Sequence, residues 1–217
     1  MSNFVVGLDL GQAQDYTAIA IAELTHAAED VAQERTIYQV RHLERFKLGT
    51  RYPEIVASVR SLCNRPPLRD VASLVVDATG VGRPVVDLLV DAGLSPVAVS
   101  ITGGNAVTQD EDGAYRVPKR DLVSAVQVLL QSQRLKIASS LALADLLVKE
   151  LLAFRVKITA DAHDTYGAWR ESAHDDMVLA VALACWYGEA HPPVKIWGGH
   201  SGGEPVVLGR RPPDWVW

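Results

Sequence analysis

Cysteine is scarce in this chain of 217 residues, in which only Cys63 and Cys185 occur. Neither their number nor their spacing indicates a disulfide framework, so a reducing compartment fits the chain best. Long apolar runs are missing as well, because none reaches the roughly 18 residues that a membrane span needs. Residues 1–4 carry no basic stretch ahead of an apolar core and no cleavage pattern, so the sequence predicts a cytoplasmic protein without membrane contact.

Catalytic motifs with a fixed signature are missing too. The chain has no Gly-x-Ser-x-Gly elbow, no Walker A loop and no Cys/His set with zinc spacing, so nothing indicates a serine nucleophile, a P-loop or a zinc site. A basic surplus is also lacking, since the net charge is −5 and the isoelectric point about 5.7. Strong nucleic-acid binding by the isolated chain is therefore not expected. Segregated charge can still form a local positive groove. Acids cluster at residues 110–112, whereas basic residues gather at Arg41, Arg45, Lys47 and Arg51 and at Arg116, Lys119 and Arg120.

The composition predicts one globular domain followed by a tail. Hydrophobic residues make up 48% of the chain, which is enough for one sizeable core. This domain is expected to span residues 1–190. Residues 191–217 are rich in glycine and proline and have little capacity to form a core of their own.

Hydrophobic periodicity predicts an α/β domain built on a mixed sheet, with three antiparallel strands followed by parallel strands and flanked by helices. Pro and Gly mark several of the element ends. The expected strands cover residues 4–10, 16–24, 36–46, 71–76, 96–101 and 155–159. The expected helices cover residues 53–63, 84–92, 119–132, 141–154 and 175–189, with loops at 102–117 and 161–172.

Acidic residues stand at the ends of three apolar runs. Asp9 and Asp77 each end a strand, and Asp175 and Asp176 open the apolar run at residues 177–187. Carboxylates in such places are costly to desolvate unless they share cations, and ligands of open α/β sheets bind beyond the carboxyl ends of strands. We therefore expect metal ligation by Asp9, Asp77 and Asp176. Asp175 is either a helix cap or a further ligand.

Each of these acids also has an ordinary structural explanation, as a turn or helix-start residue. Gly7 shares the face of Asp9, and its missing side chain is expected to let a ligand approach closely. The oxygen donors suit Mg²⁺, and the arrangement indicates two-metal phosphodiester hydrolysis. In that chemistry, one cation activates a water and the other stabilises the leaving 3′ oxygen. Candidate contacts to DNA phosphates are Arg116, Lys119, Arg120 and His174.

The chain resembles a known family at these same places. The matching stretches are residues 7–11 with 15–18, 75–82, 119–120 and 174–176, which read GLDLG, DYTA, VVDATGVG, KR and HDD. They resemble the C-terminal nuclease domain of tailed-phage large terminase subunits, which has an RNase H-like fold. The resemblance spans residues 4–190. It implies a viral DNA-packaging endonuclease that cuts concatemeric double-stranded DNA with little sequence specificity.

The resemblance also implies cofactors and partners. The cations would be Mg²⁺ or Mn²⁺, held by Asp9, Asp77 and Asp176 with Asp175. Many members carry a further acid where this chain has Leu179, which leaves open whether Asp175 or Asp176 is the main third ligand. Large terminases also carry a packaging ATPase, and no Walker A sequence lies in this chain. That ATPase would therefore be a separate domain or subunit. A portal and a small terminase would be further partners, for which residues 191–217 offer a docking segment.

Three other functions compete with this interpretation. A Holliday-junction resolvase of the RuvC type belongs to the same fold superfamily and also uses scattered carboxylates. An actin-like ATPase or sugar kinase is suggested by the loosely phosphate-loop-like stretches at residues 9–11 and 77–80, although such proteins need a longer chain. The third is a packaging module without catalytic activity, against which the acids at all three places argue.

Overall fold

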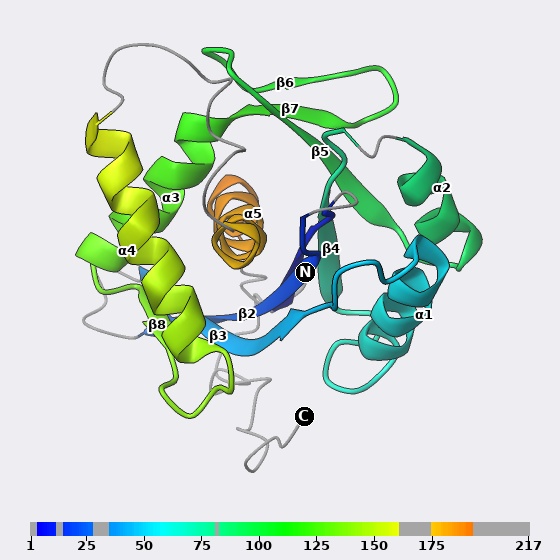
Figure 1. The fold of residues 1–217 in the computed structure, drawn as a ribbon, viewed down its shortest axis with the longest axis horizontal. Helices are drawn as coiled ribbons and strands as arrows, with labels where there is room; N and C mark the ends of the chain where they lie inside the picture. The colour runs from blue at the N-terminus through cyan, green and yellow to red at the C-terminus, as the bar shows by residue number, and fades with distance from the viewer. Residues whose placement is uncertain (1–3, 12–14, 28–34, 81–82, 161–174, 193–217) are drawn as a thin grey trace, which may run out of the picture.

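The computed structural model describes residues 4–11, 15–27, 35–80, 83–160 and 175–192. Helices cover both faces of one mixed sheet of 8 strands (Figure 1). The strands are β1 (Phe4–Asp9), β2 (Ala18–Ala27), β3 (Arg35–Arg45), β4 (Ala72–Asp77), β5 (Pro96–Thr102), β6 (Thr108–Gln109), β7 (Tyr115–Pro118) and β8 (Leu135–Ile137). The helices are α1 (Tyr52–Cys63), α2 (Arg83–Asp91), α3 (Lys119–Gln131), α4 (Ala144–Ala160) and α5 (Asp176–Ala190).

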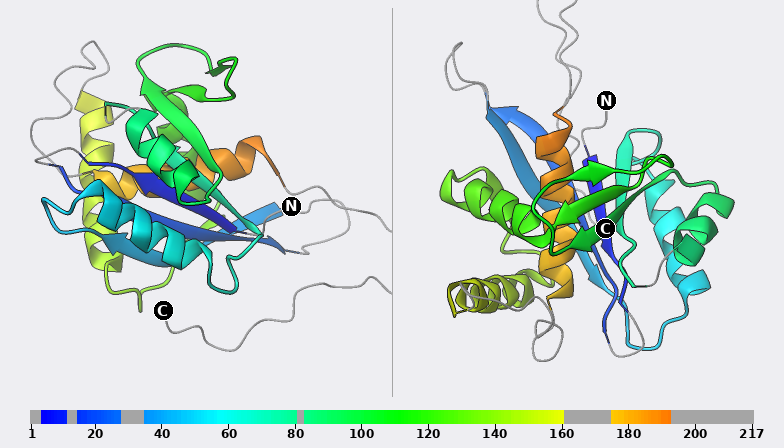
Figure 2. Two further views of the ribbon diagram at one scale, coloured as in Figure 1. Left: turned by 90° about the vertical axis from the view of Figure 1, so that its right-hand side faces the viewer. Right: turned by 90° about the horizontal axis from the view of Figure 1, so that it is seen from above.

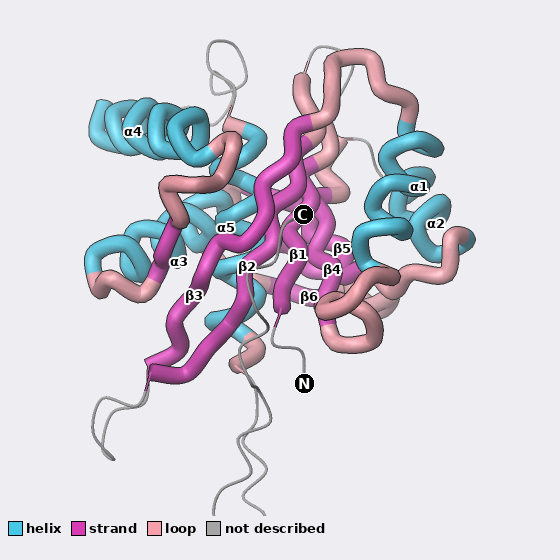
Figure 3. The backbone as a smooth tube through the Cα atoms, turned by 90° about the horizontal axis from the view of Figure 1, so that it is seen from below, coloured by secondary structure: helices cyan, strands magenta, loops and turns pink. Residues whose placement is uncertain are grey.

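The sheet order is β6-β7-β5-β4-β1-β2-β3-β8. The neighbours β1, β2 and β3 pair antiparallel, whereas β4 pairs parallel with β1, and β5 and β7 extend the parallel part. The predicted architecture of three antiparallel strands followed by parallel strands, flanked by helices, is therefore confirmed. Both faces of β1 are buried, because α3, α4 and α5 cover one side of the sheet while α1 and α2 cover the other (Figures 2 and 3).

The buried helix α5 lies against β1 at a glycine. The side chains of α5 are buried nearly all round, which explains its almost uninterrupted apolar sequence. A Cβ added to Gly7 would lie 1.9 Å from the carbonyl oxygen of Ala180 and 3.2 Å from the amide nitrogen of Ala184. The missing side chain therefore admits the backbone of α5. The expectation that Gly7 lets a ligand approach is wrong.

Three further expectations differ from the structure. The predicted loop at 102–117 contains the β6–β7 hairpin, and the short strand β8 was not predicted. Strands this short show almost no periodicity in their sequence. They form because β7 pairs with β5 and β8 pairs with β3 in the folded sheet. Residues 155–159 continue α4 instead of forming a strand, since extending an existing helix adds one hydrogen bond per residue.

Two parts of the domain prediction lie outside the described residues. These are the expected loop at 161–172 and most of the tail at 191–217. Among the residues that are described, no helix is long and apolar enough to cross a membrane.

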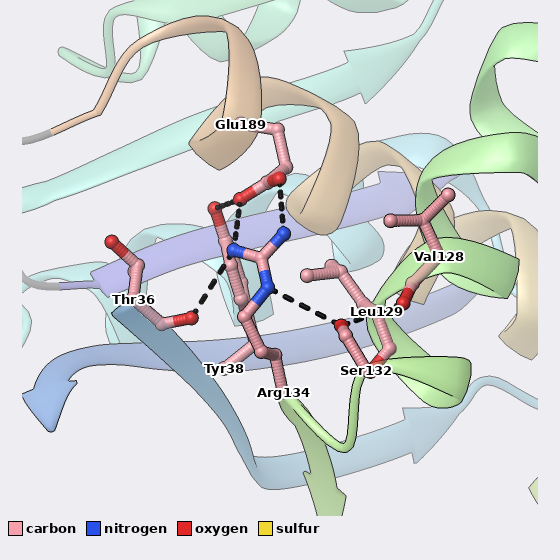
Figure 4. A network of polar contacts seen from close by, with 7 residues as sticks. All are labelled: Thr36, Tyr38, Val128, Leu129, Ser132, Arg134 and Glu189. Atoms are coloured by element: carbon pink, nitrogen blue, oxygen red, sulfur yellow. Dashed lines mark hydrogen bonds and ion pairs between the residues drawn. The ribbon is translucent and has the colours of Figure 1, made fainter. Parts of the chain in front are cut away.

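A polar network ties the far end of α5 to the sheet (Figure 4). Arg134 donates to both carboxylate oxygens of Glu189, at 2.9 and 2.5 Å. The hydroxyl of Tyr38 donates to the same carboxylate at 2.8 Å, and Arg134 also reaches the carbonyl oxygen of Thr36 at 3.3 Å. A Cβ at residue 188 would lie 2.6 Å from the Tyr38 ring, so Gly188 provides the space for that ring.

Replacement of Gly7 by alanine should destabilise the domain strongly. The added methyl group meets helix backbone, which cannot turn away as a flexible side chain can. We expect Gly7→Ala to lower the free energy of unfolding by about 3 kcal/mol, measured by urea denaturation. The control is Gly104→Ala in an exposed loop, where an added Cβ would meet only the Thr102 hydroxyl at 3.3 Å; it should change stability by no more than about 0.5 kcal/mol. Equal effects of the two substitutions would contradict the α5 packing.

Glu189 should make stability depend on pH. Burial raises the pKa of Glu189, but the hydrogen bonds from Arg134 and Tyr38 outweigh it and hold the pKa below 4.5. A lowered folded-state pKa means that the carboxylate stabilises the fold above the unfolded-state value, and that this contribution disappears as the pH falls through the folded-state value.

Glu189→Gln should therefore cost about 1 kcal/mol of unfolding free energy at about pH 7, since the carboxylate is partly exposed. The cost should shrink as the pH falls through the folded-state pKa, because the wild-type carboxyl group is then protonated as well. Urea denaturation of both proteins across this range measures the difference. A cost that is independent of pH would show that the ionised form of Glu189 contributes nothing.

Candidate active site

Asp9 and Asp77 lie side by side at the carboxyl ends of β1 and β4. The two strands are paired in parallel up to Leu8 and Val76, so the next residue of each reaches the same edge of the sheet. Both side chains are buried, with exposures of 8% and 7%, and they lie close enough to shift each other's pKa. Two carboxyl groups so buried and so close repel each other when both are ionised, and a cation between them would relieve that repulsion.

The surroundings of Asp9 strongly disfavour its ionised form. Burial raises the pKa of Asp9 well above its usual value, and the negative charges of Asp77, Asp175 and Asp176 raise it further. The four acids predicted from the sequence therefore come together closely enough to act on one another. Oxygen donors of this kind are the ligands that Mg²⁺ and Mn²⁺ accept.

The turn after β4 fixes the position of Asp77. The amide of Thr79 donates to Oδ1 of Asp77 at 2.7 Å, and the hydroxyl of Thr79 accepts from the amide of Ile101 at 2.7 Å. Burial raises the pKa of Asp77, while the bonds from Thr79 lower it in part. Strand β5 thus holds the turn, and the turn holds the carboxylate.

Asp175 and Asp176 belong to the start of α5 but have different partners. Asp175 is the N-cap residue, and its side chain makes no capping hydrogen bond. Its Oδ2 instead lies 3.5 Å from Nζ of Lys119. Asp176 is 5% exposed and pairs through both oxygens with Arg45, at 2.6 and 2.9 Å. Neighbouring helix residues differ by about 100° in direction, which accounts for the divergence.

Lys119 points into the acidic group from the start of α3. Burial lowers the pKa of Lys119, while the charges of Asp175, Asp9 and Asp77 oppose that shift. The ammonium group therefore offsets part of the negative charge of the site. The sequence did not indicate this partly buried position, because Lys119 stands next to Arg120, which is exposed.

Of the other residues predicted to contact DNA, two are exposed and one lies outside the residues that the structure describes. Arg120 donates to the side chain and backbone of Asn105, at 2.8 and 2.6 Å. Arg116 lies in β7 and is exposed. His174 falls among the residues that the structure does not describe.

Two charged residues of the site were missed by the sequence analysis. Arg45 was grouped with surface cations, yet its side chain is only 14% exposed and bonds to both Asp176 and Glu150. Glu150 of α4 is 7% exposed, and burial together with the charge of Asp176 raises its pKa to about 7. The spacing of α4 could have indicated that Glu150 is buried. Glu150 follows Leu147 by three residues and Leu146 by four, which places it on the buried face of the helix.

The side chains fit divalent cations in chemistry, but they do not form a finished site. In the part of the chain that the structure describes, no group of three or more Asp, Glu, His or Cys side chains is arranged so that it could hold a metal ion. Asp9 and Asp77 are in contact with each other, and Asp176 is turned to Arg45. Cation binding would therefore require an acid from the start of α5 to join the pair on the sheet.

Comparison with known proteins identifies the fold. The chain is similar to the large terminase nuclease from thermophilic phage G20c, with 19% identity and a TM-score of 0.52 over 83% of this chain and 80% of that one. Weaker similarity extends to the manganese-soaked terminase nuclease domain of human cytomegalovirus (14% identity, TM-score 0.48, 83% and 80% covered). It extends also to RuvC of Thermus thermophilus (12% identity, TM-score 0.42, 85% and 92% covered). No protein-family profile and no curated protein matches the chain. The chain shares its fold with the G20c large terminase nuclease, and the RNase H-like mixed sheet that the sequence resemblance predicts is confirmed.

Proposed function

We propose that this protein is a metal-dependent endonuclease that cuts double-stranded DNA during viral genome packaging. The observation that carries the proposal is the buried Asp9–Asp77 pair at the carboxyl ends of adjacent parallel strands, with Asp175 and Asp176 at the start of α5 close enough to raise the pKa of Asp9. The fold shared with the G20c terminase nuclease supports the same activity.

The cations would be Mg²⁺ or Mn²⁺, held by Asp9 and Asp77 together with Asp175 and Asp176. Bound there, they would supply the charge that activates a water and stabilises the leaving 3′ oxygen. The protein's own part is to hold the carboxylates of Asp9, Asp77 and Asp176 largely away from solvent. Thr79 fixes Asp77, and the packing of α5 on Gly7 fixes the height of Asp175 and Asp176 above the sheet. Lys119 offsets part of the negative charge that an approaching phosphate meets.

The packaging role rests on the sequence resemblance and adds partners. A packaging ATPase domain or subunit would deliver the DNA, and portal and small-terminase proteins would complete the assembly. The acidic net charge of −5 favours such an arrangement, because weak intrinsic DNA affinity is compensated when a partner holds the substrate. Residues 1–190 would be the nuclease domain, and residues 191–217 would be available for docking.

Asp77→Asn should abolish DNA cleavage. The substitution keeps the size of the side chain and an acceptor for the Thr79 amide, but removes the charge needed for a cation. We expect cleavage of supercoiled and linear plasmid in Mg²⁺ or Mn²⁺ to fall by about 100-fold or more. The matched control is Asp87→Asn on the exposed side of α2, which should cleave as the wild type does.

The substrate in the same assay separates the two nuclease hypotheses. Preference for a four-way junction over linear duplex would favour the RuvC-type resolvase. Absence of cleavage with every substrate and both metals would contradict the nuclease proposal for the isolated chain, and cleavage that survives in Asp77→Asn would place the site elsewhere.

Asp9→Asn should stabilise the cation-free protein while removing its response to metal. An amide keeps the size of the side chain but carries no charge for Asp77, Asp175 and Asp176 to repel. We expect a gain of about 1 kcal/mol in the free energy of unfolding without divalent cations.

Thermal unfolding with and without Mn²⁺ measures both effects. The wild type should gain stability from the metal, because a ligand that binds only the folded state stabilises it. The variant should gain far less. A metal-induced rise of the same size in both proteins would exclude Asp9 as a ligand.

A further inference from the structure

We propose that Arg45, held in place by Glu150, is the positioning residue that fixes the position and rotation of the Asp176 carboxylate near the Asp9–Asp77 pair. The inference rests on the proposed function and deepens it, since it concerns how one expected ligand is oriented. Neither Arg45 nor Glu150 belongs to the residues that the sequence resemblance assigns to the site.

The register of the sheet places Arg45 beside the acidic pair. Asp9 pairs with Ala18 on β2, and Ala18 pairs with Arg45 on β3, so the three residues form one row across the sheet. Directly paired residues point to the same face, and Ala18 belongs to the core beneath α5. The small Ala18 side chain lies between the two charged residues. Asp9 and Arg45 thus project toward α5 from positions two strands apart.

Arg45 binds the Asp176 carboxylate through two hydrogen bonds. Its Nε lies 2.6 Å from Oδ2 and its Nη2 lies 2.9 Å from Oδ1 of Asp176. Two parallel bonds from a planar guanidinium fix both the position and the rotation of a carboxylate, which a single ammonium contact cannot do. A carboxylate has about four lone-pair positions, and the two bonds from Arg45 take one on each oxygen of Asp176.

Glu150 and Tyr16 fix Arg45 in turn. Glu150 Oε1 accepts from Nη2 of Arg45, and its Oε2 accepts from the amide of Met177 at 3.2 Å. The guanidinium carbon lies 4.6 Å from the centre of the Tyr16 ring. Glu150 therefore joins α4 both to Arg45 and to the first turn of α5, which carries Asp176. The arrangement is buried, with side-chain exposures of 14% for Arg45 and 6% for both acids.

The charges divide in a way that fits a positioning role. Lys119 faces Asp175, Asp9 and Asp77, whereas Arg45 faces Asp176 and Glu150. Asp176 is thus the acid of the group whose orientation depends on Arg45. Partners that orient metal-binding side chains typically change metal affinity or activity by about 10- to 100-fold when they are replaced.

The test compares Arg45→Lys with the wild type by two measurements, Mn²⁺ affinity and cleavage as a function of Mn²⁺ concentration. Lysine keeps the positive charge but cannot form both hydrogen bonds to the Asp176 carboxylate in the fixed geometry of a guanidinium. Affinity is read from electron paramagnetic resonance of free Mn²⁺, which needs no DNA and no activity. We expect Mn²⁺ affinity to fall by about 10- to 100-fold, and cleavage to recover when Mn²⁺ is raised by the same factor. The exposed pair Arg41 and Glu23 provides the control, since Arg41→Lys should change neither measurement.

A second variant keeps the outcome decisive if Arg45→Lys does not fold. Glu150→Gln retains an acceptor for the Met177 amide and weakens only the hold on Arg45. It should lower Mn²⁺ affinity in the same direction. Unchanged Mn²⁺ affinity in both folded variants overturns the inference, and so does tighter binding, which would mean that Arg45 competes with the cation. A wild type that binds no Mn²⁺ overturns the proposed function itself.

Discussion

The contact between the backbone of α5 and Gly7 of β1 is the constraint on which the site depends. Because no side chain separates them, the helix lies directly on the central strand. The first turn of α5 therefore comes down beside the carboxyl ends of β1 and β4. Any larger residue at position 7 would raise the helix, and Asp175 and Asp176 would move away from Asp9 and Asp77. The packing of α5 in the core therefore also brings the acidic residues together.

Burying these acids opposes folding, and the structure limits that cost in three ways. Burial and the neighbouring acids raise the pKa of Asp9, which favours its uncharged form. Lys119 faces Asp175, and Arg45 faces Asp176. These cations come from α3 and β3, elements that the acids themselves do not occupy. Paired in this way, the buried carboxylates cost less to bury than they would without these opposite charges.

The sequence was sufficient for the parts that rest on strong local signals. Alternation and continuous apolar runs identified β1, β4 and α5, and each ends or begins at the acids predicted to gather. The parts that failed depend on distant pairing. Strand β8 has only Leu135–Ile137, too short for a periodic pattern, and Arg45 resembles any surface arginine until α4 and α5 are placed around it. Gly7 was assigned to a ligand because a glycine on a strand face signals close approach without naming what approaches.

The two faces of the domain also divide the work of stability and chemistry. On the α1 and α2 side, the buried cluster is mostly aliphatic and includes Phe4. On the α5 side, the polar groups lie at the two ends of one buried helix, with the acids at its start and the Arg134–Glu189–Tyr38 network at its finish. Ion pairs at both ends fix the position of α5 along its axis. A helix with apolar side chains all round could otherwise shift along its axis at little cost. This axial fixation matters because α5 is nearly uniform in hydrophobicity, so its packing specifies depth in the core better than register along it.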